Sequence, residues 1–268
     1  MPVVHISGPD DPRVVDYRDV GAHDRLRARG LFVAEGRLVV ERLIDDRFSI
    51  HSLLLNRAAW LAMAPRLTAL ASDVTVFVCD TQDFEELTGY DFHRGCLALA
   101  ARPALRPMDA AIADARVLVL LEDVANAENV GSIFRNAAAF GADAVVLSHG
   151  CADPLYRKAI RTSMAATLQV PFAVAPSGGW PSALMRLRQC GVQIVALTLG
   201  EPAIDLADFA RGKRADRIAL LVGAEGAGLS PESEALADVR VTIPIRSAVD
   251  SLNVSVATGI ALHLLTSA

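Results

Sequence analysis

Five short apolar segments alternate with amphipathic segments over the second half of this chain of 268 residues. The apolar segments are predicted as strands at 117–122, 144–147, 193–198, 218–222 and 241–245. The helices predicted between and after them cover 131–140, 155–167, 181–189, 231–236 and 252–265. Apolar strands that are each followed by a helix are typical of a parallel sheet with helices on both faces. The sequence therefore predicts an α/β fold.

The region before residue 104 predicts a second, smaller α/β domain. Its expected strands and helices lie at 30–44 (a strand that enters a helix), 52–55, 57–70, 74–78, 83–89 and 96–100. Pro103 and Pro107 interrupt the pattern and indicate a linker that gives way to a short helix. The predicted boundaries are 1–103 for the first domain, 104–114 for the linker and 115–268 for the second domain.

The cysteine and histidine content argues against a metal centre and against a disulfide framework. Cys79, Cys96, Cys151 and Cys190 are widely spaced, and none of the six histidines falls in a ligand-like pair. Reduced thiols in a cytoplasmic protein are expected, and no metal is expected. No charge-free run of 18 apolar residues occurs, and the first residues lack a basic region followed by an apolar core. We therefore expect neither a membrane span nor a signal peptide.

The formal net charge of −5 at pH 7 argues against nonspecific affinity for nucleic acid, although it leaves room for a local basic surface. Arginine supplies 24 of the 26 basic residues. Arginine pairs bidentately with phosphate and stacks on bases, which suits RNA. A codon-composition bias explains the same count, so composition alone leaves both interpretations open.

Polar turns follow three of the predicted strands where the chain passes into a helix. They belong to the segments 120–141, 220–231 and 243–268. Ligands of parallel sheets bind at the carboxyl ends of the strands, so these turns are candidate binding loops. Ser251 is expected to cap the last helix, and Asn129 is expected to cap the helix that starts near Gly131. The three glycines of the second segment fit neither a dinucleotide fingerprint nor a phosphate loop.

Three motifs in these segments resemble those of the SpoU (TrmH) family, which belongs to the SPOUT superfamily of knotted methyltransferases. The first is Asn-Val-Gly-(x)3-Arg from Asn129 to Arg135, and the second is Gly-(x)-Glu-Gly-(x)-Gly-Leu-Ser from Gly223 to Ser230. The third is Ser-Leu-Asn-Val-Ser-Val-Ala, which starts at Ser251. The resemblance covers roughly residues 115–268 and implies a parallel-sheet α/β domain tied into a trefoil knot.

The same resemblance implies transfer of a methyl group from S-adenosyl-L-methionine to a ribose 2′-hydroxyl of RNA. The residues that match the family's catalytic positions are Asn129, Arg135, Glu225, Ser251 and Asn253. The family binds its cofactor mainly through backbone atoms of three loops, here 197–200, 222–226 and 243–252. The expected cofactor-binding residues are Leu197, Thr198, Gly200, Val222, Gly223, Ala224, Gly226, Ile243, Ile245, Ser251 and Leu252.

Arg135 is the side chain on which the reaction is expected to depend most. It lies opposite the apolar stripe of its predicted helix. That stripe consists of Val130, Ile133, Phe134, Ala137 and Ala138. The family assigns the matching arginine to activation of the 2′-hydroxyl, but a guanidinium stays protonated and is a poor base. We interpret Arg135 as a grip on the neighbouring phosphate that aligns the hydroxyl, whose proton goes to phosphate or solvent; a surface salt bridge to Glu128 is the structural alternative.

Glu225 and Ser251 each allow more than one interpretation. The Glu225 carboxylate either orients Arg135 or Asn129, or it belongs to an exposed turn. Ser251 either positions the nucleotide or the cofactor loop, or it only caps the helix. The third motif departs from the family pattern, and we have no physical explanation for the departures at Arg246, Ser247, Ala248 and Asp250.

Two looser motifs before the linker resemble the substrate-binding domain of many SpoU methyltransferases, whose fold is like that of ribosomal protein L30e. They are Arg-(x)-Arg-(x)2-Gly-(x)-Phe-Val-(x)-Glu-Gly from Arg25 to Gly36, and His93-Arg94-Gly95. The expected RNA-binding residues are Arg25, Arg27, Arg29, Arg37, Arg157 and Arg161. A solvated helix face is the alternative for these arginines, and a strand-to-helix turn is the alternative for Glu35-Gly36.

The resemblance also implies partners. A homodimer is expected because the family's knotted domains pair and the helix predicted at 252–265 carries apolar surface. Ribosomal RNA of the large subunit is favoured over tRNA, because family members with an added N-terminal domain often act on it. The rival interpretations are methylation of a base or small molecule, and a catalytically idle RNA-binding or ribosome-assembly protein. The intact catalytic matches argue against the idle protein.

Overall fold

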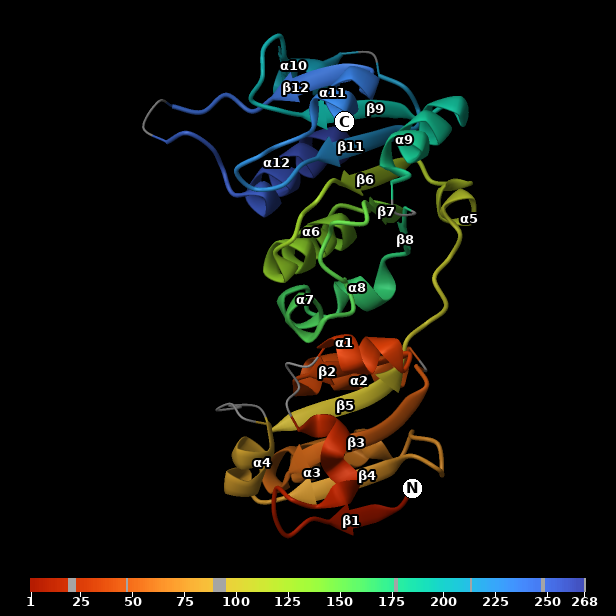
Figure 1. Ribbon diagram of the computed structural model, residues 1–268, viewed down its shortest axis with the longest axis vertical. Coiled ribbons are helices and arrows are strands. Elements are labelled where there is room, and N and C mark those ends of the chain that lie inside the picture. The colour runs from red at the N-terminus through yellow and green to blue at the C-terminus, as the bar shows by residue number, and fades with distance from the viewer. Residues whose placement is uncertain are drawn as a thin grey trace. The chain divides into compact units, whose positions relative to one another are not determined.

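The computed structural model describes residues 1–18, 23–46, 48–88, 95–175, 178–212, 214–246 and 249–267 (Figure 1). The chain forms two compact units. The N-terminal unit consists of Met1–Pro103 with Leu155–Ala165, and the C-terminal unit consists of Ala104–Pro154 with Ala166–Ala268. The segment Leu155–Ala165 thus packs with the N-terminal unit, which differs from the single second domain predicted from residue 115 onwards.

A seven-stranded sheet forms the centre of the C-terminal unit. Its strands are β6 (Val117–Leu121), β7 (Ala144–Leu147), β8 (Phe172–Val174), β9 (Gln193–Leu197), β10 (Ile204–Asp205), β11 (Ile218–Val222) and β12 (Val239–Thr242). All neighbouring strands are parallel, in the order β10-β12-β9-β11-β6-β7-β8. The predicted parallel α/β fold is therefore confirmed. The sequence does not predict β8 and β10, because runs of three and two residues show no recognisable apolar pattern.

The helices of the C-terminal unit mostly lie where the sequence places them. They are α5 (Met108–Ile112), α6 (Ala127–Ala139), α8 (Ala166–Gln169), α9 (Trp180–Gln189), α10 (Leu206–Arg211), α11 (Pro231–Leu236) and α12 (Val254–Thr266). The single helix predicted at 155–167 is wrong. The chain forms α7 (Arg157–Thr162) in the N-terminal unit and then α8, because Met164 and Ala165 between them take left-handed φ angles of 53° and 71°.

Side chains of the strands alternate between the two faces of this sheet, so two separate cores form. Val119 and Leu121 pack on one face with Phe134 of α6 and Leu262 of α12. On the opposite face, Leu118 and Leu120 of the same strand pack in one cluster with Leu184 and Leu187 of α9. The two faces together fix the carboxyl ends of the strands at one edge of the unit.

The apolar stripe predicted for α6 is confirmed with one correction. Val130, Ile133, Phe134 and Ala137 are fully buried, whereas Ala138 is exposed. Because a helix has 3.6 residues per turn, position 138 lies beyond the edge of the buried face. Asn136 faces α12: its Nδ2 donates to the Ser255 carbonyl at 2.7 Å.

The N-terminal unit has a mixed five-stranded sheet in the order β1-β4-β3-β5-β2. Its strands are β1 (Val3–His5), β2 (Leu31–Glu35), β3 (Ile50–Asn56), β4 (Thr75–Cys79) and β5 (Cys96–Ala101). Its helices are the 3-10 helix η1 (Pro12–Tyr17), α1 (His23–Ala28), α2 (Arg37–Asp45), α3 (Arg57–Leu67), α4 (Thr81–Thr88) and α7. The strand β5 runs antiparallel to β2 and β3, whereas β1, β3 and β4 are parallel. His93 and Arg94 lie outside the described residues.

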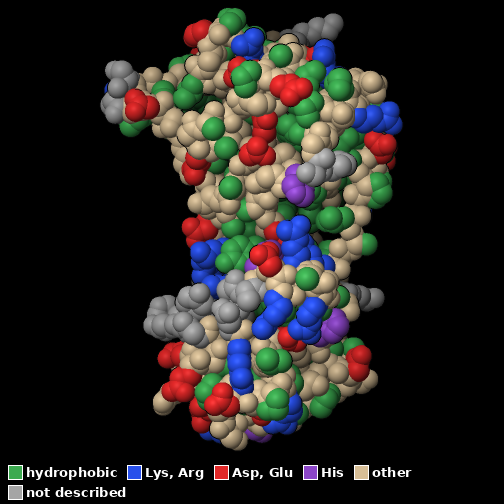
Figure 2. Space-filling view, viewed as in Figure 1, with side chains coloured by type: hydrophobic (Ala, Val, Ile, Leu, Met, Phe, Trp, Pro, Cys, Tyr) green, Lys and Arg blue, Asp and Glu red, His purple; other side chains and the backbone are tan. Residues whose placement is uncertain are grey.

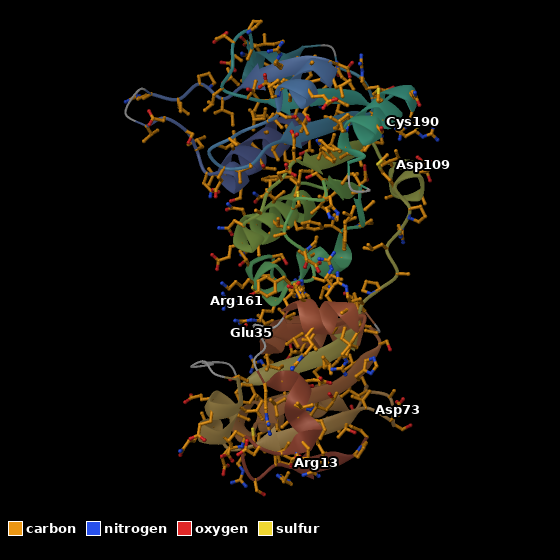
Figure 3. All side chains as sticks on the ribbon, viewed as in Figure 1. Arg13, Glu35, Asp73, Asp109, Arg161 and Cys190 are labelled. Carbon is orange, nitrogen blue, oxygen red and sulfur yellow. The ribbon has the colours of Figure 1, made fainter. Side chains whose placement is uncertain are left out.

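A buried ion pair joins α7 to this sheet. Glu35, at the end of β2, is 7% exposed and accepts a hydrogen bond from Arg157 Nη1 at 3.1 Å. Arg161 Nη1 lies 3.5 Å from the other carboxylate oxygen, and Figure 3 labels Glu35 and Arg161 side by side. Gly36 follows with φ 97°, so the strand-to-helix turn expected here is confirmed. Arg42 of α2 also donates to the Met164 carbonyl at 2.7 Å, which holds the end of the α7 segment.

Replacing Glu35 with alanine should lower the free energy of local opening of α7. The substitution removes the carboxylate that accepts from the buried Arg157 guanidinium, and breaking a buried ion pair by removing one partner costs about 3–5 kcal/mol. We expect amide hydrogen exchange of Arg157–Thr162 to report a loss of opening free energy of about that size. The matched control is Asp45→Ala, which removes the exposed partner of Arg66 and should change exchange by less than about 1 kcal/mol. Unchanged exchange of α7 in Glu35→Ala would contradict this role of the ion pair.

Candidate active site

A cavity of about 580 Å³ lies at the carboxyl ends of β9, β11 and β12 in the C-terminal unit. Each of the three predicted cofactor loops contributes to its wall. All of the expected cofactor-binding residues line it, namely Leu197, Thr198, Gly200, Val222, Gly223, Ala224, Gly226, Ile243, Ile245, Ser251 and Leu252. Leu199, which lies within the predicted loop 197–200, also lines it. The further lining residues Ala227, Gly228, Leu229, Glu234, Val254 and Ala257 were not predicted as cofactor-binding residues. The structure thus brings together three separate segments that lie between Leu197 and Ala257.

The glycine-rich loop after β11 is folded so tightly that one position excludes any side chain. A Cβ atom at Gly223 would lie 2.2 Å from the Gly228 carbonyl oxygen. Gly228 takes a φ of 71° and donates its N–H to the Ala224 carbonyl at 2.9 Å. The turn therefore needs glycine at both ends, and its backbone groups lie directly at the cavity.

Glu122 anchors this loop at both of its ends, a role that the sequence did not reveal. Its side chain is 6% exposed and accepts hydrogen bonds from Ser230 Oγ at 2.7 Å, from Ser233 Oγ at 3.0 Å and from the Ser230 N–H at 3.3 Å. Its own N–H donates to the Val222 carbonyl at 2.9 Å, where the loop begins. A buried carboxylate is stable when such donors surround it. The only sequence signal was an acidic residue at the end of an apolar strand.

One asparagine connects the three motifs. Asn253 Nδ2 donates to Asn129 Oδ1 at 3.0 Å and to Glu225 Oε1 at 2.8 Å. Asn253 Oδ1 accepts from the N–H and the hydroxyl of Ser255 at 2.9 and 2.6 Å. Each end of this amide therefore has its own partners, which fixes its orientation. Residues that lie 124 and 28 positions apart from Asn253 in the sequence meet at this point.

The two predicted helix caps are wrong by two or three residues. Asn126, not Asn129, caps α6, because its Oδ1 accepts from the N–H groups of Glu128 and Asn129. Asn253, not Ser251, caps α12. Asn129 and Ser251 therefore do not cap helices. Asn129 is 7% exposed and is bonded to Asn253, and Ser251 lines the cavity.

Glu225 and Arg135 do not contact each other. Glu225 is an exposed residue of its turn, which agrees with the alternative interpretation. Its carboxylate is bonded to Asn253, and not to Arg135 or Asn129, the partners predicted from the sequence. Arg135 is exposed on α6, and no hydrogen bond or ion pair joins its guanidinium to another described residue. The alternative salt bridge to Glu128 is thus not formed. An unpartnered guanidinium is available for an anionic ligand such as a phosphate.

The charges around the cavity favour a cationic ligand. Glu225 and Glu234 are the two charged side chains among the described lining residues, and both are acidic. Loops that present backbone N–H and C=O groups can bind a nucleoside without further side chains. The wall therefore fits S-adenosyl-L-methionine, whose sulfonium is positively charged.

No thiol or metal chemistry is indicated near these strands. Cys151, after β7, donates from Sγ to the Leu121 carbonyl at 3.2 Å, and burial raises the pKa of its thiol, so it is a weak nucleophile. Over the described ranges, no group of three His, Cys, Asp or Glu side chains could hold a metal ion. The site offers hydrogen bonds and charge.

The arginines expected to bind RNA differ in their surroundings. Arg25 and Arg27 of α1 are exposed. Arg29 is bonded to Asp16, and Arg37 lies 3.7 Å from Glu41. Figure 2 shows basic side chains gathered over the part of the N-terminal unit around α1 and α7.

The expectation that Arg157 binds RNA is wrong. Arg157 is 6% exposed and bonded to Glu35, so its guanidinium is held in a buried ion pair and not on the surface. Its neighbours Lys158 and Arg161 are exposed. In the third motif, Arg246 and Asp250 are exposed, whereas Ser247 and Ala248 lie outside the described residues.

Known proteins resemble this chain along nearly its whole length. An uncharacterized tRNA/rRNA methyltransferase of Mycobacterium tuberculosis is 39% identical over 267 residues, which cover 98% of this chain and 91% of the relative. A 23S rRNA guanosine 2′-O-methyltransferase of Bacillus subtilis is 24% identical over 97% of this chain and 98% of its own. The structure of an AdoMet-bound rRNA methyltransferase from Sinorhizobium meliloti has a TM-score of 0.82 at 26% identity, and the match covers 98% of this chain and 97% of that one.

The sequence model of the SpoU rRNA Methylase family matches residues 116–263, which is more than half of the chain. That range contains Asn129, Glu225 and Asn253, which the structure joins, and the three loops that line the cavity. It also contains the exposed Arg135 of the first motif. The chain belongs to the SpoU rRNA methylase family.

Proposed function

We propose that this protein transfers a methyl group from S-adenosyl-L-methionine to a ribose 2′-hydroxyl of RNA. The observation that carries the proposal is the link that Asn253 makes to both Asn129 and Glu225 at a cavity formed by the predicted cofactor loops. Membership of the family supports methyl transfer to RNA. The AdoMet-bound Sinorhizobium meliloti structure supports the cofactor, and the name of the Bacillus subtilis relative supports the 2′-hydroxyl.

The residues present suggest how the reaction is assisted. When bound, the cofactor supplies a methyl group on a positively charged sulfur. Glu225, held by Asn253, places a negative charge in the cavity wall, which would favour a positively charged ligand. Arg135 grips the phosphate beside the target ribose and aligns the hydroxyl with the methyl group. The proton passes to phosphate or solvent, because a guanidinium does not accept it.

Ribosomal RNA of the large subunit is the favoured substrate, because the Bacillus subtilis relative is named for 23S rRNA and matches 97% of this chain. Transfer RNA is the first alternative, since the Mycobacterium tuberculosis relative is named for both RNAs. Mapping 2′-O-methyl sites in ribosomal and transfer RNA, with and without the protein, distinguishes them. A labelled methyl group found on a base or small molecule would instead support the rival enzyme, and no transfer at all would support the idle RNA-binding protein.

The N-terminal unit is proposed to bind RNA. Its region 1–103, joined by the linker 104–114 to the catalytic region 115–268, carries the exposed Arg25 and Arg27 on α1. We include α7 in this surface, since Lys158 and Arg161 are exposed on it. Basic side chains on one surface supply the salt-dependent part of RNA affinity.

Three further features are proposed. First, the loops around the cavity form a trefoil knot. The strand β12 follows β11 in the chain but lies between β9 and β10 in the sheet, which supports a threaded connection.

Second, the protein is a homodimer, since Val256 and Ile260 of α12 are 51% and 37% exposed. Third, it is cytoplasmic, and the four free cysteines agree with a reducing compartment. No described helix is long and apolar enough to cross a membrane.

The exposed apolar face of α12 should govern dimer formation. A carboxylate at Val256 or Ile260 would be buried without a partner in the proposed interface, so Val256→Glu and Ile260→Glu should sediment as monomers near 28.5 kDa while the native protein sediments as a dimer. Leu61→Glu is the control, because Leu61 is 63% exposed on α3 of the N-terminal unit. A native protein that is only monomeric at micromolar concentration would contradict the dimer.

Arg135→Ala should abolish most turnover and leave the fold intact, because the exposed guanidinium bonds to none of the residues that the structure describes. If its work is confined to the transition state, kcat and kcat/KM should fall together by about 100–1,000-fold. Arg135→Lys should rescue little, because an ammonium lacks the planar fork of donors. Calorimetry with S-adenosyl-L-methionine should give an unchanged Kd. Arg211→Ala, at another exposed arginine of the same unit, is the control, and near-normal turnover of Arg135→Ala would sink the assignment.

Asn253→Asp should produce an enzyme that recovers activity as the pH falls. The replacement keeps the oxygen that caps α12 but sets a second carboxyl against Glu225 Oε1 in place of the donor Nδ2. Two neighbouring carboxylates raise the pKa of one of them, and the protonated form can donate again. Activity relative to the native enzyme should therefore rise on acidification. Asn126→Asp alters the cap of α6 without touching Glu225 and should show no such trend; identical pH profiles for both variants would argue against a role of the Asn253–Glu225 bond.

A further inference from the structure

Glu234 lies outside the family motifs, yet it lines the cavity. It sits on α11, and its side chain is 23% exposed. The first carboxylate in the wall, Glu225, belongs to the second motif and is already bonded to Asn253. Glu234 comes from another element and has different partners, so the two acidic groups present different chemistry to a ligand.

Two contacts fix the Glu234 carboxylate in place. The Thr198 hydroxyl accepts from the Gly200 N–H at 2.9 Å and donates to Glu234 Oε1 at 2.6 Å. Because that hydroxyl has only one proton, its single donor is committed to Glu234. Arg240 Nη1 lies 3.7 Å from the other oxygen, Oε2. The carboxylate is therefore held rigidly before any ligand arrives.

Gly200 leaves one side of this carboxylate uncovered. A Cβ atom built at Gly200 would lie 3.3 Å from Thr198 Oγ1 and 3.6 and 3.8 Å from the two carboxylate oxygens. A longer side chain there would cover the acceptors. With glycine, the remaining lone pairs of Glu234 stay open on the side of the cavity wall that Gly200 shares.

The charge balance differs between the two acidic groups. Glu225 forms no ion pair with any described residue and so retains its negative charge for a cation. The nearby Arg240 guanidinium offsets the charge of Glu234, which makes that carboxylate a better acceptor for neutral O–H donors than for an ammonium. S-adenosyl-L-methionine carries one neutral group with two O–H donors on adjacent carbons, the vicinal diol of its ribose.

We infer that Glu234 accepts hydrogen bonds from the vicinal hydroxyls of the cofactor ribose and thereby selects a ribonucleoside cofactor. The two oxygens of a carboxylate can each accept from one hydroxyl of such a diol, as acidic residues do in dinucleotide-binding sites. Thr198 acts as a positioning residue that aims the carboxylate. This inference rests on the proposed cofactor, and it adds a specificity determinant that the family motifs do not contain.

The test measures affinity for the product S-adenosylhomocysteine and for its 2′,3′-dideoxy analogue by calorimetry on the full-length protein. Losing bonds from a charged acceptor should weaken binding of the dideoxy analogue to the native protein about 10–100-fold. In Glu234→Gln, which turns an amide towards the diol, the ratio of the two Kd values should shrink to less than about threefold, as in a double-mutant cycle. Thr198→Val should reduce the ratio partly.

The controls separate this inference from the proposed function. Glu232→Gln, an exposed carboxylate of the same helix, should keep the native ratio. If Glu234→Gln does not fold, Glu234→Asp, which withdraws the carboxylate by one methylene, takes its place with the same expectation. A native ratio near one, or an unchanged ratio in the Glu234 variants, would overturn the ribose contact alone. A native protein that binds neither S-adenosyl-L-methionine nor its product would overturn the proposed cofactor itself.

Discussion

The site depends on one amide whose nitrogen and oxygen bind different partners at the same time. Asn253 Nδ2 binds Asn129 and Glu225, while Oδ1 of the same side chain begins α12. Helix formation and assembly of the three motifs are therefore coupled, because α12 cannot start in this register without presenting the donor to both partners. The packing of Asn136 against the Ser255 backbone sets the distance between α6 and α12 that this geometry requires. The exposed Arg135 then projects from a helix whose position is already determined.

The second layer of this arrangement is the anchoring of the glycine-rich loop. A loop with several glycines has high conformational freedom in the unfolded chain, so it needs fixed ends to hold one shape. Glu122 supplies both ends by binding Val222 through its backbone and Ser230 through its side chain. Electrostatic assistance requires charges that are held in place before the reaction. The buried carboxylate thus keeps the Glu225 turn ready although it does not face the ligand.

The sequence predicted the parallel sheet and the loops of the cavity well, because both follow from local patterns. Apolar runs such as 218–222 and the motif spacings carry that information directly. It failed where a partner distant in the chain decides the outcome. Asn129 and Ser251 were expected to cap helices, but Asn126 and Asn253 do so. Glu122 is positioned by Ser230, 108 residues away, and Glu234 is bonded to Thr198, 36 residues away, and no pattern in one sequence reports such contacts.

The helix α7 also has a consequence for how such proteins can be recombined. Because Leu155–Ala165 belongs to the N-terminal unit, the chain passes between the units at three places rather than at the linker alone. A chimera that exchanges only residues 1–103 would separate Glu35 from Arg157, with which it forms the ion pair. Exchange of the N-terminal unit between relatives therefore requires that Glu35 and Arg157 are exchanged together. The ion pair ties a segment from the middle of the region that matches the SpoU family to the N-terminal unit.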